Sequence, residues 1–185
     1  MVSVKPRGVP FTRSLRPMTR QRILLLTGLF ALATAGGAAG QAVRIGPSGY
    51  PVPRYVALKF DEVNARGGPG DDYRLLWTYR ARGLPVQVVA ETRDWRRVCD
   101  PQGGVAWVKA TGVDGRTRVM RTQKGPLAIR RAPQPNAPVK AFLAERALAD
   151  LGQCRKGWCK IKLGAEGGWI PAGAVWGTDP RQQCR

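Results

Sequence analysis

Aromatic side chains beside basic ones are the residues of this sequence best suited to binding a ligand. Trp95 precedes two arginines, and Trp158 stands two positions before a lysine. A cation beside an indole ring favours cation–π contacts, and a guanidinium can bind a carboxylate through two parallel hydrogen bonds. An alternative is that each tryptophan only covers one end of a small fold and stabilises it. The set predicted to contact a ligand comprises Tyr73, Trp95, Arg96, Arg97, Trp158 and Lys160.

Groups that could perform catalysis are few. The 185-residue chain contains no His, which excludes a Ser-His-Asp triad, a Cys-His dyad and a His-ligated metal. Asp61-Glu62 ends a β-prone run and Asp71-Asp72 lies among glycines, as solvated turn carboxylates do. Ser48, the one serine after residue 42, lacks a basic partner that would activate it. We therefore expect no enzyme activity, no cofactor and no bound metal.

The N-terminus has the pattern of an export signal. Residues 23–35 are uncharged and apolar, follow two arginines and precede a run of Gly and Ala. We predict a signal peptide over residues 1–42, with Met18 as a possible true start. Ala39, Gly40 and Ala42 each suit cleavage, and Ala42 is preferred. An uncleaved anchor is the alternative, but thirteen helical residues span only ~20 Å of a ~30 Å hydrocarbon layer. The expected location is the periplasm or the exterior, with no stable membrane span after cleavage.

The remaining 143 residues are strongly basic. They hold 25 Lys and Arg against 12 Asp and Glu, a net charge of +13. Such a field attracts anions, including nucleic acid, anionic membranes and acidic wall polymers. Arg outnumbers Lys by 23 to 8 in the whole chain, and the arginines are scattered rather than clustered. Because the chain is expected to be exported, we predict no nucleic-acid partner.

Four cysteines in a small exported protein favour disulfides over a metal site. Cys154 and Cys159 flank a tight turn, whose two sides can approach to the ~5.5 Å Cα separation of a bridge. We predict that these two are bonded. Cys99 and Cys184 are left over: pairing would tie the C-terminal tail to the first half of the chain, and an intermolecular bond or free thiols are the other possibilities.

Short β-prone runs separated by Gly and Pro recur about every ten residues from Val56 onward, which is typical of an all-β protein. Residues 43–55 contain three Pro and two Gly and predict an extended lead-in. Residues 141–151 are rich in Ala and Leu and favour a helix on propensity alone. The internal repeat of the sequence argues against that helix.

Three short blocks recur in the same order, at offsets of 64, 63 and 62 residues. The matched blocks are residues 63–66 with 127–130, 95–98 with 158–161, and 107–108 with 169–170. The repeating unit has the size of a small β-barrel. The predicted organisation is a first copy at 56–110, a linker at 111–123, a second copy at 124–178 and a tail at 179–185.

These blocks carry a family resemblance. V-N-A-R-G-G-P-G, then W-R-R-V, then A-W-V resembles the bacterial SH3-like (SH3b) family, in which the first block usually reads L-N-V-R-S-G-P and the last G-W-V. Trp176-Gly177 is similar to the closing L-W-G of exported two-copy members in Gram-negative bacteria. Ala65 and Val105-Ala106 depart from the pattern. The resemblance implies two tandem small SH3-like barrels after a signal peptide.

The resemblance also implies a function. Members of the family bind wall material or peptides, so we expect an exported, non-catalytic SH3b protein that recognises peptidoglycan or peptide ligands in the cell envelope. The alternative is an envelope scaffold that binds another exported protein by strand addition or through a groove. A fold alone does not fix a function, and the sequence does not separate these two roles or indicate an oligomeric state.

Overall fold

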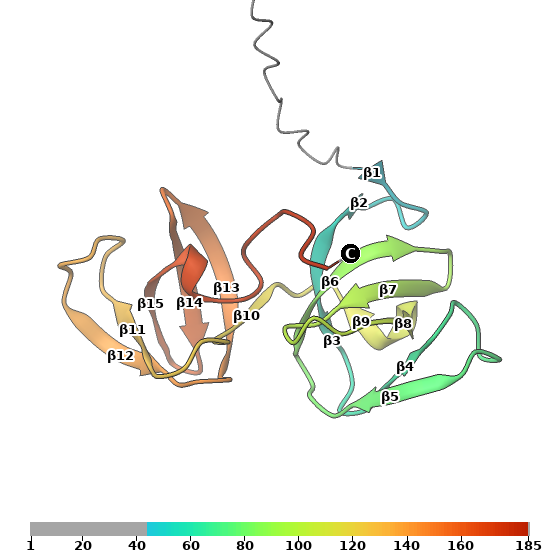
Figure 1. Cartoon of the computed structure of the whole chain (residues 1–185). Helices are drawn as coiled ribbons and strands as arrows, with labels where there is room; N and C mark the ends of the chain where they lie inside the picture. Colours follow the sequence, from blue (N-terminus) through green and yellow to red (C-terminus); the bar gives the residue numbers. More distant parts are fainter. Residues whose placement is uncertain (1–43, 185) are drawn as a thin grey trace, which may run out of the picture. The chain divides into compact units, whose positions relative to one another are not determined.

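The computed structural model describes residues 44–184, and nearly all regular structure in this part of the chain is β (Figure 1). The other regular elements there are two short 3₁₀ turns, η1 (Ala110–Gly112) and η2 (Ala172–Ala174). The all-β prediction is confirmed. The predicted signal peptide, its possible start at Met18 and its cleavage site lie outside the described residues.

The first copy of the repeat forms a seven-stranded antiparallel sheet with the order β5-β4-β8-β7-β6-β3-β9. Two further strands, β1 (Arg44–Ile45) and β2 (Pro51–Val52), form a small hairpin within the lead-in. The strands of the sheet are β3 (Arg54–Leu58), β4 (Val63–Arg66), β5 (Leu75–Tyr79), β6 (Pro85–Glu91), β7 (Trp95–Cys99), β8 (Val105–Lys109) and β9 (Val113–Asp114).

The second copy forms a six-stranded sheet with the order β10-β13-β14-β15-β11-β12. Its strands are β10 (Arg118–Met120), β11 (Leu127–Arg130), β12 (Val139–Leu143), β13 (Leu148–Arg155), β14 (Trp158–Leu163) and β15 (Glu166–Pro171). Residues 141–151 contribute to β12 and β13, so tertiary pairing overrides their helix propensity. Among the described strands, no pairing joins the two edges of either sheet, so neither sheet closes into a ring.

A shared arginine contact shows that the two copies are the same structure. Arg66 Nη1 donates to the carbonyl oxygen of Tyr73 at 2.8 Å, and Arg130 Nη1 donates to that of Ala137 at 2.8 Å. Each arginine ends its strand, β4 or β11, and closes the loop that follows. The strands on either side of this loop shift register at the arginine in both copies. The repeated arginine is therefore a structural clasp, with an offset of 64 residues.

The expected linker at 111–123 belongs to both sheets. Its first part contains β9, which pairs with β3, and its second part contains β10, which pairs with β13. Met120 joins the apolar core of the first copy, and Val119 joins that of the second. The segment is ordered because burial of these two side chains favours a fixed strand over a free tether.

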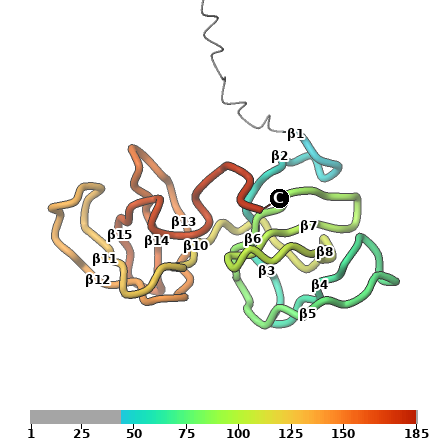
Figure 2. The backbone as a smooth tube through the Cα atoms, viewed as in Figure 1, coloured from blue at the N-terminus to red at the C-terminus, as the bar shows by residue number. Residues whose placement is uncertain are grey.

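The C-terminal tail packs on the first copy, as Figure 2 traces. Cys184 forms a disulfide with Cys99 of β7, with a Cα–Cα distance of 5.8 Å. The side chain of Gln87 is fully buried: its amide nitrogen donates to the carbonyl of Arg181, and its oxygen accepts from the backbone of Gln183, both at 2.8 Å. A buried amide costs free energy unless it is hydrogen-bonded, so the tail completes the first copy.

Candidate functional site

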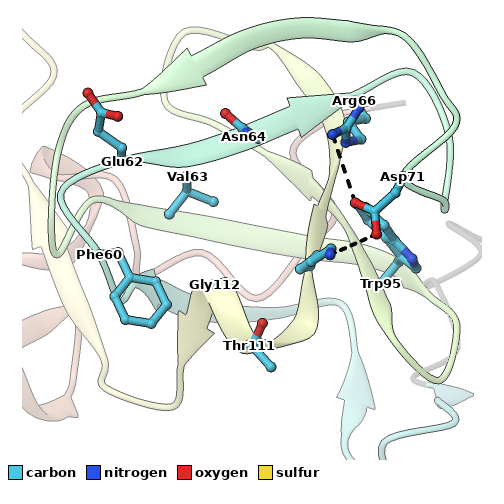
Figure 3. Close-up of a pocket in the computed structure, with 10 residues that line it drawn as sticks. Phe60, Glu62, Val63, Asn64, Arg66, Asp71, Trp95, Thr111 and Gly112 are labelled. Carbon is cyan, nitrogen blue, oxygen red and sulfur yellow. Dashed lines mark ion pairs between the residues drawn. The ribbon is translucent and has the colours of Figure 1, made fainter.

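A pocket of about 250 Å³ lies in the first copy, between β4, the start of β7, the end of β8 and η1 (Figure 3). Three segments that are distant in the sequence meet there because β4 and β7 both pair with β8. The lining residues that define its chemistry are Phe60, Asn64, Asp71, Trp95, Lys109 and Thr111.

One end of the pocket is charged. The carboxylate of Asp71 lies 2.7 Å from Lys109 Nζ and 3.8 Å from Arg66 Nη2, and Figure 3 marks both ion pairs. Lys109 Nζ in turn lies 5.8 Å from the ring centroid of Trp95. Asp71 keeps 63% of its side chain exposed, as expected of a turn carboxylate, but it is paired rather than free. This end offers charges of both signs to a ligand.

The other end of the pocket is mixed: Phe60 and Val63 lie there beside Glu62, whose carboxylate is 3.3 Å from Arg80. Phe60 is 49% exposed, and the buried Val63 lies beneath this end of the pocket. Between the two ends, Asn64 Oδ1 accepts a hydrogen bond from Thr78 Oγ1 at 2.9 Å. The structure shows no partner for the amide nitrogen of Asn64 among residues 44–184. The pocket can therefore receive an apolar group, a hydrogen-bond acceptor and a charged group in that order.

Trp95, predicted to contact a ligand, is buried. Its exposed fraction is 8%, because Lys109 lies directly across the β7–β8 pair and covers the ring. Long basic side chains commonly cover apolar surface with their methylene groups while the charge stays in water. Trp95 thus forms a wall of the pocket and supports Lys109.

The second copy lacks the polar groups of this pocket. The strand registers and the arginine clasp place Ala128 where the first copy has Asn64. By the same correspondence, Pro135 stands in place of Asp71. Pro171 lies across from Trp158, as Lys109 lies across from Trp95. An amide, a carboxylate and an ammonium group are all missing, so this site exists only in the first copy.

Arg96 has a structural partner. Arg96 Nε lies 3.2 Å from the carboxylate of Glu91, whose side chain is only 1% exposed. Glu91 also accepts hydrogen bonds from Arg54 at 2.7 Å and from the hydroxyl of Ser48 at 2.5 Å. Burial raises the pKa of Glu91, the hydrogen bonds from Ser48 and Arg54 lower it, and the net shift is downward. This cluster fastens the lead-in to the hairpin that presents Trp95.

The other predicted contact residues lie outside the pocket. Tyr73 is 46% exposed, on the loop beside it. Arg97 is half-buried opposite Trp107 in the β7–β8 pair. Trp158 and Lys160 belong to β14 of the second copy. Of the six residues predicted from sequence, only Trp95 lines the pocket, and their roles in binding stay predictions.

Sequence reasoning missed most of the pocket. Phe60, Asn64 and Lys109 carry no local signal, because only the strand register brings them together. Asp71 had a signal, since it lies within the loop that the repeated arginine begins. The sequence interpretation treated it as solvated.

The described residues show neither a metal site nor a membrane span. Within residues 44–184, no three His, Cys, Asp or Glu side chains gather in a way that could hold a metal ion. In the same part of the chain, no helix is long and apolar enough to cross a membrane.

The fold and the repeated clasp define a tandem SH3-like protein, and comparison with known families agrees. The bacterial SH3 domain model matches the chain twice, over residues 59–115 and 123–177. These matches span more than half of the chain, which therefore belongs to the bacterial SH3 domain family. Comparison with curated proteins found no match.

Among solved structures, two from Trichomonas vaginalis are similar. The structure of NlpC2 shares 12% identity at a TM-score of 0.32, covering 68% of this chain and 48% of that one. The structure of NlpC1 shares 12% identity at a TM-score of 0.32, covering 72% of this chain and 49% of that one. The chain thus spans about half the length of each.

Proposed function

We propose that this protein is an exported, non-catalytic binding protein that recognises peptide parts of the cell wall through the pocket of its first copy. Membership of the bacterial SH3 domain family supports an envelope role. The two disulfides support an oxidising compartment, because such bonds persist outside the cytosol. The peptide part of the wall carries carboxylates, which suit the basic charge of the chain.

The observation that carries the proposal is the ion pair of Asp71 with Lys109 next to Trp95. Both side chains of the pair are more than half exposed, and such pairs contribute only about 0.2–1 kcal/mol. A ligand can therefore separate the two partners at little cost. Its ammonium group would bind Asp71, and its carboxylate would bind Lys109, while an apolar side chain contacts Phe60.

Sedimentation of the mature chain with purified peptidoglycan, at low and high salt, tests this proposal. Charge-assisted hydrogen bonds contribute about 1.5–3 kcal/mol, so Asp71→Asn should weaken binding about tenfold or more. Asp72→Asn is the matched control, because this neighbouring carboxylate forms no ion pair among the described residues. Thermal melts of both variants should match the wild type. Equal binding by Asp71→Asn, or no wild-type binding at low salt, contradicts the proposal.

A specific observation also favours the scaffold role. The edge strand β5 exposes Leu75 and Leu76, and the corresponding edge strand β12 exposes Val139. Unpaired strand edges with apolar side chains can accept a strand from a partner protein. If this role is correct, one defined protein from envelope extract should bind the wild type and should not bind the variant with Leu75→Lys and Val139→Lys.

A further inference from the structure

The β13–β14 hairpin of the second copy concentrates positive charge. Four cations lie on the same hairpin as one half-buried tryptophan, and none forms an ion pair with another described residue. Three of the eight lysines of the chain lie within residues 156–162, although Arg dominates elsewhere. We call this surface the basic hairpin; it comprises Arg155, Lys156, Trp158, Lys160 and Lys162.

The strand arranges these groups in a row. Cys159 and Ile161 of β14 are buried, so the alternating residues Trp158, Lys160 and Lys162 face outward. Successive outward residues of a strand are ~6.8 Å apart. The basic hairpin therefore presents an aromatic ring and two ammonium groups at regular intervals, with two more cations at the turn.

The turn is rigid. Lys156 and Gly157 both have positive φ, at 48° and 78°, as a two-residue hairpin turn requires. The disulfide of Cys154 with Cys159 crosses the hairpin directly behind the turn, with a Cα–Cα distance of 4.0 Å. Arg155 is held over the ring of Trp169 at 4.6 Å. Little conformational freedom is left for a ligand to remove.

The acidic side chains near the basic hairpin form ion pairs with residues outside it. Asp150 lies across from Lys162, but its carboxylate forms an ion pair with Arg118 at 3.0 Å. Glu166 lies 3.7 Å from Lys140. The charge of the basic hairpin is therefore not neutralised within the described part of the chain.

The first copy shows that the fold does not require all of these charges: Arg93 and Arg97 stand in place of Lys156 and Lys160, but no cation stands in place of Arg155 or Lys162. Its equivalent hairpin carries the Glu91–Arg96 ion pair at the position of the second disulfide. Its turn contains Asp94 beside Arg93. Cys99, bonded to the tail, stands in place of Lys162. The second copy therefore has all four cations and lacks the pocket, whereas the first copy has the pocket and keeps a cation at only two of the four positions.

We propose that the basic hairpin binds an extended, phosphate-bearing polyanion of the cell envelope, at a site separate from the pocket. Lysine ammonium groups bind phosphate as compact point charges, without the fixed two-oxygen geometry that a bidentate arginine contact requires. A row of lysines suits a linear polymer with repeating charges, and Trp158 supplies a surface for its backbone. This proposal does not depend on the wall-peptide function.

Titration of the mature chain with linear inorganic polyphosphate, followed by calorimetry at two salt concentrations, tests the proposal. The hairpin variant carries Lys156→Gln, Lys160→Gln and Lys162→Gln. The control carries Arg74→Gln, Arg82→Gln and Arg93→Gln, which remove the same charge from exposed sites in the first copy. We expect at least tenfold weaker binding by the hairpin variant and less than threefold by the control. The slope of log affinity against log salt should also fall by roughly 0.7 for each phosphate that the hairpin variant no longer neutralises.

Three results would overturn the proposal: equal weakening by both triple variants, no wild-type binding at low salt, or poly-glutamate of the same length binding as tightly. Circular dichroism checks folding, and Lys160→Gln alone should act in the same direction if the triple variant is unstable. This proposal and the wall-peptide function can fail separately. Asp71→Asn should bind polyphosphate as the wild type does. In the hairpin variant, adding Asp71→Asn should still weaken binding to peptidoglycan.

Discussion

The buried carboxylate of Glu91 should support both the stability of the first copy and the position of Trp95. Glu91→Gln keeps the shape of the side chain but removes its charge from between Arg54 and Arg96. These two arginine side chains are only 16% and 11% exposed, so each is left partly desolvated without its counter-ion. Breaking a buried pair destabilises by about 3–5 kcal/mol.

We expect Glu91→Gln to lower the free energy of unfolding by about 3 kcal/mol, because the arginines keep some access to water. For a chain of this size the change corresponds to a fall of about 10 °C in Tm. The matched control is Glu62→Gln. Glu62 pairs with Arg80 at 3.3 Å, but both side chains are mostly exposed, so the change should stay within about 0.5 kcal/mol. Urea and thermal unfolding of residues 43–185 without reductant measure both.

The pH dependence of the stability tests the same prediction in a second way. Because the pKa of Glu91 is lowered on folding from its ordinary value of 4.5, its stabilisation is present above that value. The stabilisation is lost as the pH falls through the lower pKa of the folded state. The gap in Tm between wild type and Glu91→Gln should therefore narrow below about pH 4.5. Equal Tm values for Glu91→Gln and Glu62→Gln at pH 7 would show that the charge of Glu91 does not stabilise the first copy.

Two further predictions concern stability. Under the chain-entropy model, removing the Cys99–Cys184 bond should cost about 4.5 kcal/mol and removing Cys154–Cys159 about 2 kcal/mol, because the first closes a much longer loop. Urea unfolding of the two Cys→Ser pairs checks this order, and the reverse order would contradict it. Trp95→Ala should cost about 3–5 kcal/mol because the ring is 8% exposed. A wild-type melt for Trp95→Ala would show that the indole is not buried.

The strands and the two copies of the fold could be predicted from the sequence. Apolar residues at every second position indicated the strands, and the recurring R-x-x-P and R-x-G-P blocks indicated two copies of one fold. The predicted bond between Cys154 and Cys159 is present, because the two residues flank a turn only four residues long. The pairing of Cys99 with Cys184, left open in the sequence, is also present. Sequence spacing was sufficient to predict the Cys154–Cys159 disulfide but not the Cys99–Cys184 disulfide.

The pocket depends on which residues lie opposite each other in paired strands. The sequence alone did not predict this strand register. Lys109 reaches Trp95 because β7 and β8 pair antiparallel with these two residues opposite each other. Asp71 reaches Lys109 because the Arg66 clasp bends the loop back over the sheet. Arg96, which was predicted to contact a ligand, forms an ion pair with the buried Glu91, and its role in binding stays a prediction. A basic residue next to a tryptophan in the sequence does not indicate which carboxylate lies opposite it on the neighbouring strand.

The central claim is that the first copy alone binds wall peptide. Nuclear magnetic resonance of the isotope-labelled mature chain, titrated with soluble peptidoglycan fragments, tests it most directly. We expect chemical-shift changes at the side chains of Asn64 and Trp95 and at the backbone of Thr111, with the signals of Ala128 and Pro171 in the second copy unmoved. Shifts confined to the second copy, or no shifts at saturating fragment, would contradict it.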